Sequence, residues 1–240
     1  MISLLDTHVH SIASGHAYST ITENIRAAAD AGLQLVAITD HAPGMPDTAL
    51  FSHFGNLNAL PREMFGVTIL RGVELNIMDY DGRTDMSDGQ IRGLDVRIAS
   101  LHTPCIKPGT AAQNTSAIIG AMRNPLIQVM GHIGDPLYPF DLDRVLDTAA
   151  ETGTIIEINN LSLDTSHPAR RGGEATVRAI AEGCLKRGLP VIMGSDAHVH
   201  TNVGMHTFAQ ALLEELGFPD ELVLNTSISL FYNKMGLRTK

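Results

Sequence analysis

The 240-residue sequence predicts a single α/β domain, residues 1–240, whose parallel strands close into a seven-stranded, TIM-like barrel. Two observations support this prediction. Seven short apolar segments alternate with helical segments, and each is nearly continuous in its apolar character, as expected for parallel strands covered on both faces. Successive apolar segments end about 30 residues apart, which is the length of one strand–helix unit.

The expected strands are distributed along most of the chain, at 2–6, 33–39, 67–75, 94–100, 126–131, 154–159 and 189–194. A capping box formed by Thr20 and Glu23 opens a helix that ends at Gly32. Further helical patterns cover 113–123, 141–152, 173–187 and 205–216. An eighth short strand near 222–226 and an open doubly wound sheet are the alternatives. Only a closed barrel brings the ends of the first and last strands together.

The composition argues against several classes of partner. The formal net charge is −9 and there is no Trp, whereas duplex binding needs clustered Lys and Arg and single-strand binding uses aromatic platforms. Nucleic acid is therefore an unexpected partner. No apolar run is long enough to span a membrane, and no signal-peptide pattern is present. Cys105 and Cys184 predict reduced thiols in a cytoplasmic protein.

Side chains of the types that bind divalent metals gather at one structural position. Eight of them lie at or beside the ends of six predicted strands, and a ninth lies in the loop after the first strand. The nine are His8, His10, His16, His41, Glu74, His102, His132, Asp196 and His198. Imidazoles and carboxylates are the ligands that zinc prefers, and barrels of this kind hold their chemistry at the carboxyl ends of the strands. The sequence therefore predicts a multinuclear metal site and a hydrolase.

Other polar residues near the strand ends have less certain roles. Asp6 shares a strand face with His8, which predicts that its carboxylate accepts a hydrogen bond from a ligand imidazole. Glu157 lies inside an apolar strand and is interpreted as a structural acid. Among the remaining histidines, His53 and His167 are the ones expected to line the pocket, with a surface position as an alternative of at least equal weight.

The motifs DTHVH, ITDHAP, GVELN, SLH, GH and GSDAH, in this order and spacing, resemble the PHP (polymerase and histidinol phosphatase) superfamily of metal-dependent phosphoesterases. The likeness is greatest to its YcdX-type stand-alone phosphatases and extends to about residue 232. It implies a distorted (β/α)7 barrel with three zinc ions, although manganese and iron suit the same ligands. Carried onto this sequence, the first ion has His8, His10, Glu74 and Asp196, the second Glu74, His102 and His132, and the third His16, His41 and His198.

Such a site predicts hydrolysis of small phosphomonoesters by a metal-activated hydroxide, without a covalent intermediate. Glu74, Asp196 and His198 are the expected catalytic groups within the ligand set. Arg170 and Arg171 are candidates to bind the substrate phosphate, with an exposed basic loop as the equal alternative. The expected partner is a small phosphorylated metabolite, and the resemblance also implies a homo-oligomer such as a trimer.

Three other functions are compatible with many metal ligands on a barrel: an amidohydrolase, a nuclease-type phosphodiesterase and a non-catalytic regulatory module. Amidohydrolases that carry an HxH motif often bridge two metals with a modified Lys. Here none of the four Lys residues ends a predicted strand, and Glu74 has the bridging position instead. The acidic charge argues against the nuclease, and the complete ligand set argues against the regulatory module.

Overall fold

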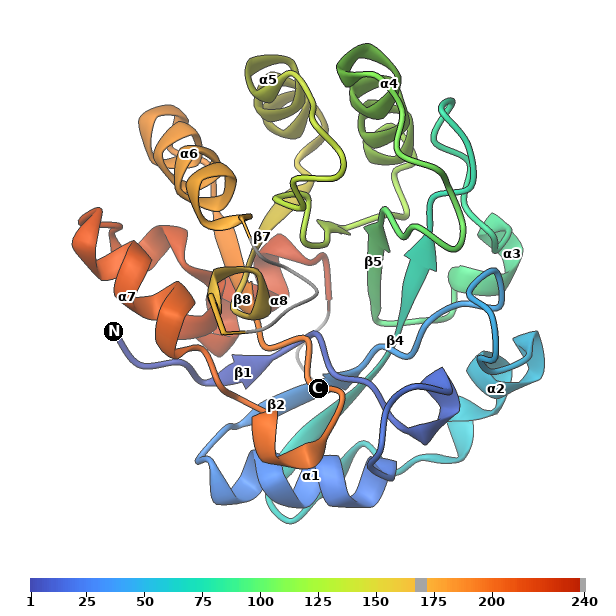
Figure 1. Ribbon diagram of the computed structural model, residues 1–240. Coiled ribbons are helices and arrows are strands. Elements are labelled where there is room, and N and C mark those ends of the chain that lie inside the picture. The colour runs from blue at the N-terminus through green and yellow to red at the C-terminus, as the bar shows by residue number, and fades with distance from the viewer. Residues whose placement is uncertain (167–171, 238–240) are drawn as a thin grey trace.

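The computed structural model describes residues 1–166 and 172–237. In this part of the chain, seven parallel strands follow one another in the order β1-β2-β4-β5-β6-β7-β8, and β3 pairs antiparallel with β4 at the side. The sheet curls into a barrel with helices on its outside (Figure 1). The strands are β1 (Leu5–Asp6), β2 (Leu35–Ile38), β3 (Glu63–Met64), β4 (Val67–Asn76), β5 (Val96–Ser100), β6 (Val129–Met130), β7 (Ile155–Asn159) and β8 (Val191–Gly194). The predicted distorted seven-stranded barrel is confirmed.

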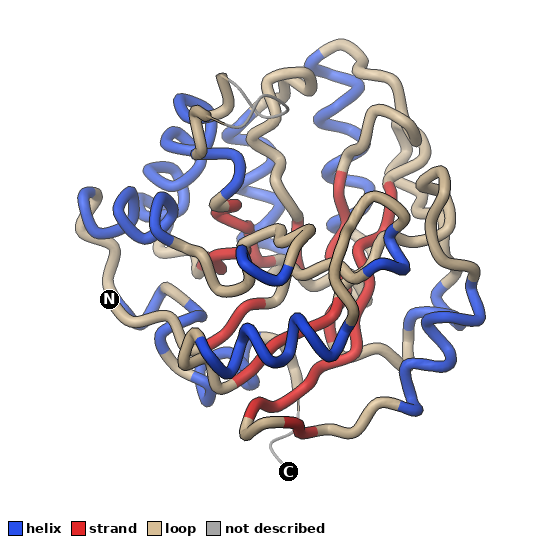
Figure 2. The backbone as a smooth tube through the Cα atoms, turned by 60° about the horizontal axis from the view of Figure 1, so that its bottom comes forward, coloured by secondary structure: helices blue, strands red, loops and turns tan. Residues whose placement is uncertain are grey.

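Helices cover the barrel on the outside and appear as a partial ring around the strands (Figure 2). The longer ones are α1 (Ile21–Asp30), α4 (Ala111–Met122), α5 (Leu142–Thr152), α6 (Glu174–Arg187) and α7 (Thr207–Glu215), and the shorter ones are α2 (Phe51–Asn56), α3 (Asp88–Ile91) and α8 (Ile228–Lys234). The expected capping box is present, since Thr20 accepts from the Glu23 N–H and the Glu23 carboxylate accepts from the Thr20 N–H. Of the described helices, none combines the length and apolar character needed to cross a membrane.

The core has an inner and an outer layer. Each of the seven parallel strands contributes to a buried inner cluster that includes Leu5, Leu35 and Ile192, and Phe231 of α8 packs into the same cluster. A larger cluster lies between the sheet and the outer helices. The inner cluster fills the barrel below the strand ends and leaves the carboxyl ends of the strands for polar groups.

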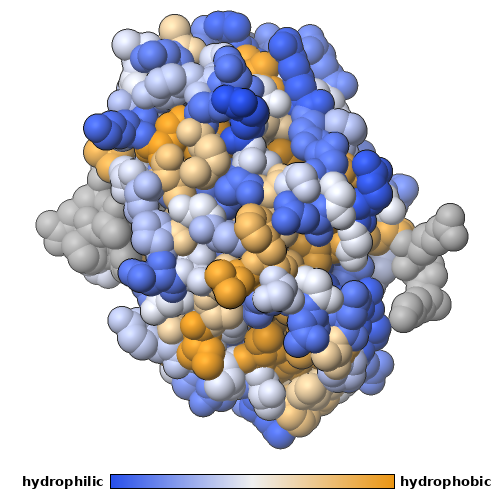
Figure 3. All heavy atoms as spheres, turned by 90° about the vertical axis from the view of Figure 1, so that its right-hand side faces the viewer, coloured by the Kyte–Doolittle hydropathy of each residue, from blue (hydrophilic) through white to orange (hydrophobic). Residues whose placement is uncertain are grey.

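On the outer surface, the face over α2 and α3 shows apolar side chains scattered among polar ones (Figure 3).

The seam between β1 and β8 is closed by short contacts instead of a continuous strand pair. Above the strands, the His10 N–H donates to the Ala197 carbonyl at 2.9 Å and the Ala197 N–H donates to the His8 carbonyl at 3.2 Å. Below, the buried Asn225 amide accepts from the Met193 N–H at 2.7 Å and donates to the Leu5 and Met193 carbonyls at 3.0 and 2.9 Å. These contacts place the ligand-bearing ends of the first and last strands side by side.

The region expected as an eighth strand takes a shorter form. Residues Leu224–Thr226 form a 3-10 turn, and only Val223 makes a parallel bridge, to Val191. This turn places the Asn225 side chain between β1 and β8. The amide can bond to both strands because it carries both a donor and an acceptor.

Candidate metal centre

The Glu74 carboxylate lies at the centre of the predicted ligands. It is fully buried near the end of β4, the longest strand, and five imidazoles surround it. The nitrogen-to-oxygen distances are 2.7 Å from His41, 2.8 Å from His132, 3.2 Å from His102, 3.4 Å from His8 and 3.5 Å from His10. A carboxylate in this position can reach several metal positions at once.

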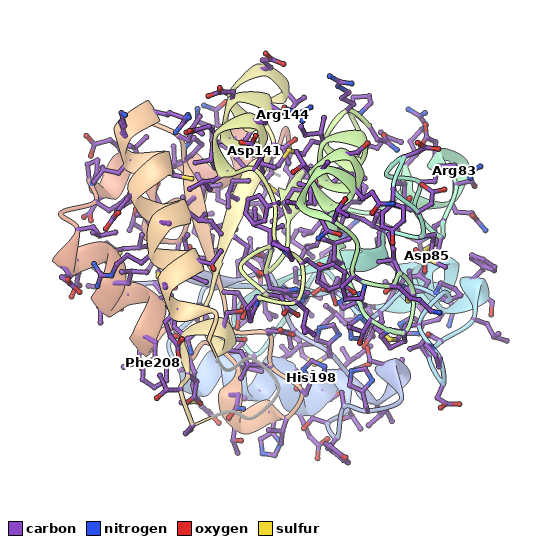
Figure 4. All side chains as sticks on the ribbon, turned by 45° about the horizontal axis from the view of Figure 1, so that its top comes forward. Arg83, Asp85, Asp141, Arg144, His198 and Phe208 are labelled. Atoms are coloured by element: carbon purple, nitrogen blue, oxygen red, sulfur yellow. The ribbon has the colours of Figure 1, made fainter. Side chains whose placement is uncertain are left out.

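A second carboxylate, Asp196, completes the group on the side of β8. Its Oδ1 lies 3.3 Å from His10 Nε2 and 3.6 Å from His8 Nε2. His198 follows two residues later at the rim, where its side chain is 26% exposed (Figure 4). His16 reaches the same rim from the loop after β1, with its ring centroid 4.9 Å from that of His41 and 4.8 Å from that of His198.

The nine predicted ligands thus come together at one end of the barrel. Among the described residues, four groups of three have ligand atoms within 4.8 Å of one another. They are His8–His10–Asp196, His8–Glu74–His132, His41–Glu74–His102 and His10–His41–His198. His16 belongs to none of these groups and joins the site through ring contacts alone.

Two ligands have a backbone conformation that residues other than glycine rarely adopt. His132 has φ 30° and Asp196 has φ 55°. Such strain costs on the order of 1–3 kcal/mol and persists only where the surroundings impose it, most often at functional sites. Of the four described residues other than glycine that have a positive φ, two are predicted ligands, and the others are Asp47 and Phe65.

The His8 ring is oriented by Glu157. Glu157 Oε1 lies 2.6 Å from His8 Nδ1, and Oε2 accepts from the His132 N–H at 2.8 Å and from Asn159 Nδ2 at 3.1 Å. Because the carboxylate takes the proton-bearing Nδ1, the Nε2 lone pair of His8 faces Glu74 and Asp196. The expectation that Asp6 would accept from a ligand imidazole is wrong.

Asp6 has a different task, which explains that error. Its carboxylate accepts from the backbone N–H groups of His8, Ser195 and Gly204, so it ties the start of the barrel to the loop after β8. Asp6, two residues before His8, faces the same side of the strand but lies one layer lower in the barrel. The carboxylate that reaches the His8 imidazole is Glu157, which comes from β7.

The His10 ring is oriented by Ser14. Ser14 Oγ lies 3.1 Å from His10 Nδ1 and donates to Asp40 Oδ1 at 2.7 Å. Asp40 also accepts from the N–H and hydroxyl of Ser11 and, at 3.1 Å, from His53 Nε2. Burial alone would raise the pKa of Asp40, but these donors and the nearby His10 outweigh burial and lower that pKa to about 2.

Two further imidazoles donate outward through Nδ1 in the same way. His102 Nδ1 lies 2.7 Å from Asn76 Oδ1, and the Asn76 amide in turn donates to Asp85 at 2.7 Å. His198 Nδ1 lies 2.9 Å from the Asp196 carbonyl. Holding Nδ1 in this manner leaves Nε2 as the ligand atom, which is the usual arrangement of histidines that bind metals.

The atoms that remain inside the pocket fit a divalent cation. His8 Nε2, His10 Nε2 and Glu74 Oε2 are buried and have no hydrogen-bond partner within the described structure. Buried polar atoms without a partner are rare and costly. Three such atoms face one space, and a metal ion bound there would satisfy them together.

The charge states of these groups also suit metal ligands. Burial and the neighbouring His41 and His198 lower the pKa of His10, and they lower that of His16 to about 4, so both rings are neutral at pH 7. Burial opposes ionisation of Glu74, but the surrounding imidazoles outweigh it and lower its pKa well below the usual range. Burial also opposes protonation of His8, but the carboxylates of Glu157, Glu74 and Asp196 outweigh it and raise the pKa of this ring well above its usual value. A bound cation would therefore displace a proton from His8, whereas His10 and His16 are neutral beforehand.

The mouth of the site is a hollow of about 430 Å³. His16, His102 and His132 form its floor, and Met45, Leu101 and Leu137 are among the apolar residues of its wall. His53 borders a different hollow beside the site. His167, Arg170 and Arg171 lie outside the described residues, so their predicted roles remain predictions.

The sequence matches the family model of the PHP domain over residues 6–167. The chain belongs to the PHP domain family. It is 50% identical to a probable phosphatase of Caldanaerobacter subterraneus subsp. tengcongensis, over 94% of this chain and 88% of that protein. It is 43% identical to a probable phosphatase of Acetivibrio thermocellus, over 95% and 93% of the two chains.

A solved structure shares the fold of this chain. The histidinol phosphate phosphatase of Lactococcus lactis, whose crystal structure holds zinc, L-histidinol and phosphate, aligns with a TM-score of 0.65 at 19% identity, over 91% of this chain and 95% of that chain. At 19% identity this likeness shows a shared fold alone. The zinc, L-histidinol and phosphate are ligands of the Lactococcus protein.

Proposed function

We propose that this PHP protein is a metal-dependent phosphatase that hydrolyses small phosphomonoesters at a centre of three divalent ions. The observation that carries the proposal is the set of buried, unpartnered atoms of His8, His10 and Glu74, which converge where a cation would satisfy them. Zinc is the ion that imidazole and carboxylate ligands favour, and the same set accepts manganese or iron. The curated relatives, which are named probable phosphatases, support a phosphate ester as substrate.

The ligand groups support more than one metal position. Glu74 belongs to two of them, one with His8 and His132 and one with His41 and His102, so its carboxylate would be shared between positions. In the proposed arrangement the first position has His8, His10, Glu74 and Asp196, the second Glu74, His102 and His132, and the third His16, His41 and His198. The grouping of His10 with His41 and His198 supports a third position at the rim, which His16 would complete from its loop.

Divalent ions in such a centre supply an activated water and neutralise the charge of the phosphoryl group. In the reaction, the oxygen of water bonds to phosphorus while the ester P–O bond breaks, and the alcohol leaves with a proton that derives from water. The negative charges of Glu74 and Asp196 would hold the cations, and His198 lies at the open rim where substrate would enter. Arg170 and Arg171 are the proposed contacts to the substrate phosphate.

A protein nucleophile is not needed for this reaction. Cys105 is the thiol near the site, with its N–H bonded to the His102 carbonyl at 2.9 Å. Burial and the negative charges of Asp85 and Glu74 raise the pKa of this thiol to about 11, so it is protonated and unreactive at neutral pH. Direct attack by water is the step that this chemistry favours.

The dimensions of the mouth support a small substrate. A hollow of about 430 Å³ lies within the usual range for sites that bind metabolites. The Lactococcus neighbour, solved with L-histidinol and phosphate, supports the same class of small phosphorylated metabolite for this fold.

The test is release of phosphate from an aryl phosphate by the purified protein and by Glu74→Gln, with Glu151→Gln as the control. Glu151 is an exposed carboxylate on α5. We expect Glu74→Gln to lose more activity than the ~10–100-fold typical of a residue that supports a ligand, while the control keeps full activity. A metal-loaded protein that cleaves a lactone, an amide or a phosphodiester, and leaves the monoester intact, would refute the proposal.

A further inference from the structure

We infer that His53 is a positioning residue for the metal centre, acting through Asp40 and Ser14 on the orientation of the His10 imidazole. The inference rests on the proposed metal centre and is independent of which phosphate ester is cleaved.

A continuous chain of hydrogen bonds joins the two histidines. His53 Nε2 lies 3.1 Å from Asp40 Oδ2, Asp40 Oδ1 accepts from Ser14 Oγ at 2.7 Å, and Ser14 Oγ lies 3.1 Å from His10 Nδ1. An ionised carboxylate can only accept, so Ser14 must direct its O–H toward Asp40. The Ser14 lone pair then faces His10, which must carry its proton on Nδ1 and keep Nε2 for a metal.

His53 contributes one of the donors that keep Asp40 in place. Among the described residues, Asp40 Oδ2 receives the Ser11 hydroxyl at 2.8 Å and His53, while Oδ1 receives Ser14 and the Ser11 N–H. Asp40 is almost fully buried, so each donor it loses is costly. Without His53, Oδ2 keeps one donor, the Ser11 hydroxyl, and Oδ1 keeps both of its donors, so the carboxylate is held less firmly in the orientation that faces Ser14.

The helix that carries His53 is fixed from the other side. Phe54, the next residue of α2, is buried in the outer core with an exposed fraction of 3%. This anchor sets the position of α2 against the barrel, so the distance between His53 and Asp40 depends on the fold and not on a mobile surface side chain.

His53 acts from outside the substrate mouth. It is 22% exposed and lines an open groove of about 840 Å³ with Ile12, Ala13 and Asn56. The mouth is lined by other residues, among them His16, His102 and His132. His53 therefore lies beside a different hollow from the one that would admit substrate, which makes it a positioning residue and not a catalytic one.

The experiment measures zinc affinity by competition with a chromophoric chelator, for His53→Ala, His53→Gln and the control Asn56→Ala. The Gln amide nitrogen can replace Nε2 as the donor to Asp40, and Asn56 lines the same groove without a hydrogen bond to Asp40. We expect His53→Ala to weaken the tightest zinc step about 3- to 10-fold, less than the ~10–100-fold of a direct partner of a ligand. His53→Gln should restore affinity to within about 2-fold, and Asn56→Ala should match the unmodified protein.

The thermal unfolding of the metal-free variants measures the structural contribution of His53 separately. Loss of a donor to buried Asp40 should lower the unfolding temperature of His53→Ala below that of His53→Gln. Simple structural support would leave the zinc affinity of the folded protein unchanged, whereas positioning lowers it in His53→Ala and not in His53→Gln. Equal zinc affinity in His53→Ala and the unmodified protein, or a loss that Gln does not restore, would overturn the inference and leave the proposed metal centre standing. Failure of the unmodified protein to bind zinc would instead refute the metal centre, and the inference with it.

Discussion

Glu157→Gln is the substitution that tests the orientation of the ligands most sharply, because it changes one atom of a residue that is not itself a proposed ligand. The carboxylate accepts from His8 Nδ1 at 2.6 Å, from the His132 N–H at 2.8 Å and from Asn159 Nδ2 at 3.1 Å. An amide has one accepting oxygen, so it cannot serve donors on both sides.

Both orientations of the Gln amide are unfavourable. If its oxygen faces His8, its NH₂ group meets the donating N–H of His132. If its NH₂ group faces His8, the imidazole must accept at Nδ1 and carry its proton on Nε2, which removes the lone pair that a metal needs. Loss of such a partner lowers metal affinity ~10–100-fold, which corresponds to about 1.4–2.7 kcal/mol.

The assay is a zinc titration against a chelator of known affinity, with Glu151→Gln as the control for loss of one negative charge. Glu151 is exposed on α5, so the control should bind zinc as the unmodified protein does. If Glu157→Gln also binds zinc with unchanged affinity, the Glu157–His8 contact does not orient the ligand and the account of the site is wrong.

Three further predictions concern close packing, barrel closure and pH. A Cβ on Gly194 would lie 2.0 Å from Glu157 Oε1, so Gly194→Ala should displace that carboxylate and lower zinc affinity. Because both substitutions act through Glu157, the double variant with Glu157→Gln should lose less affinity than the sum of the two single losses, and additive losses would contradict this. Asn225→Ala removes three buried hydrogen bonds to backbone groups, of which, among the described residues, only the Leu5 carbonyl keeps a side-chain donor, Ser3, and should lower the free energy of unfolding by on the order of 3 kcal/mol. The exposed Asn233→Ala should change it little in the same urea titration. Asp40 has its pKa lowered from 3.8 to about 2, so its contribution of about 2 kcal/mol is present above pH 4 and is lost as the pH falls toward 2. The unfolding free energy of metal-free Asp40→Asn should therefore converge with that of the unmodified protein over this range, and a constant difference would argue against the shifted pKa.

The features that the sequence predicts well are those that depend on local pattern. Apolar runs covered on both faces predict all seven parallel strands, and polar residues just after these runs predict the site. Two strands are shorter than predicted because their hydrogen-bonded pairing with neighbouring strands ends early. β1 covers Leu5–Asp6 where 2–6 is expected, and β6 covers Val129–Met130 where 126–131 is expected. Strand length depends on hydrogen-bonded neighbours, and β1 at the seam pairs as a strand only with β2.

The features that the sequence does not predict depend on contacts between distant segments. Glu157 reaches His8 across 149 positions, and Asn225 reaches Leu5 across 220. No local pattern distinguishes Glu157 from Asp6 as the partner of His8, because both are carboxylates on strands that border the same pocket. The support of His10 by Ser14 is similar, since a Ser in a Ser-rich loop has no pattern that marks it as an orienting group.

Whether the gathered side chains hold divalent metal ions for phosphate ester hydrolysis is tested by metal analysis of the purified protein beside an aryl phosphate assay with and without chelator. We predict two to three metal ions per chain and phosphate release that chelator abolishes and added zinc restores. A protein that binds no metal, or that releases phosphate equally well after the metal is removed, would contradict this prediction.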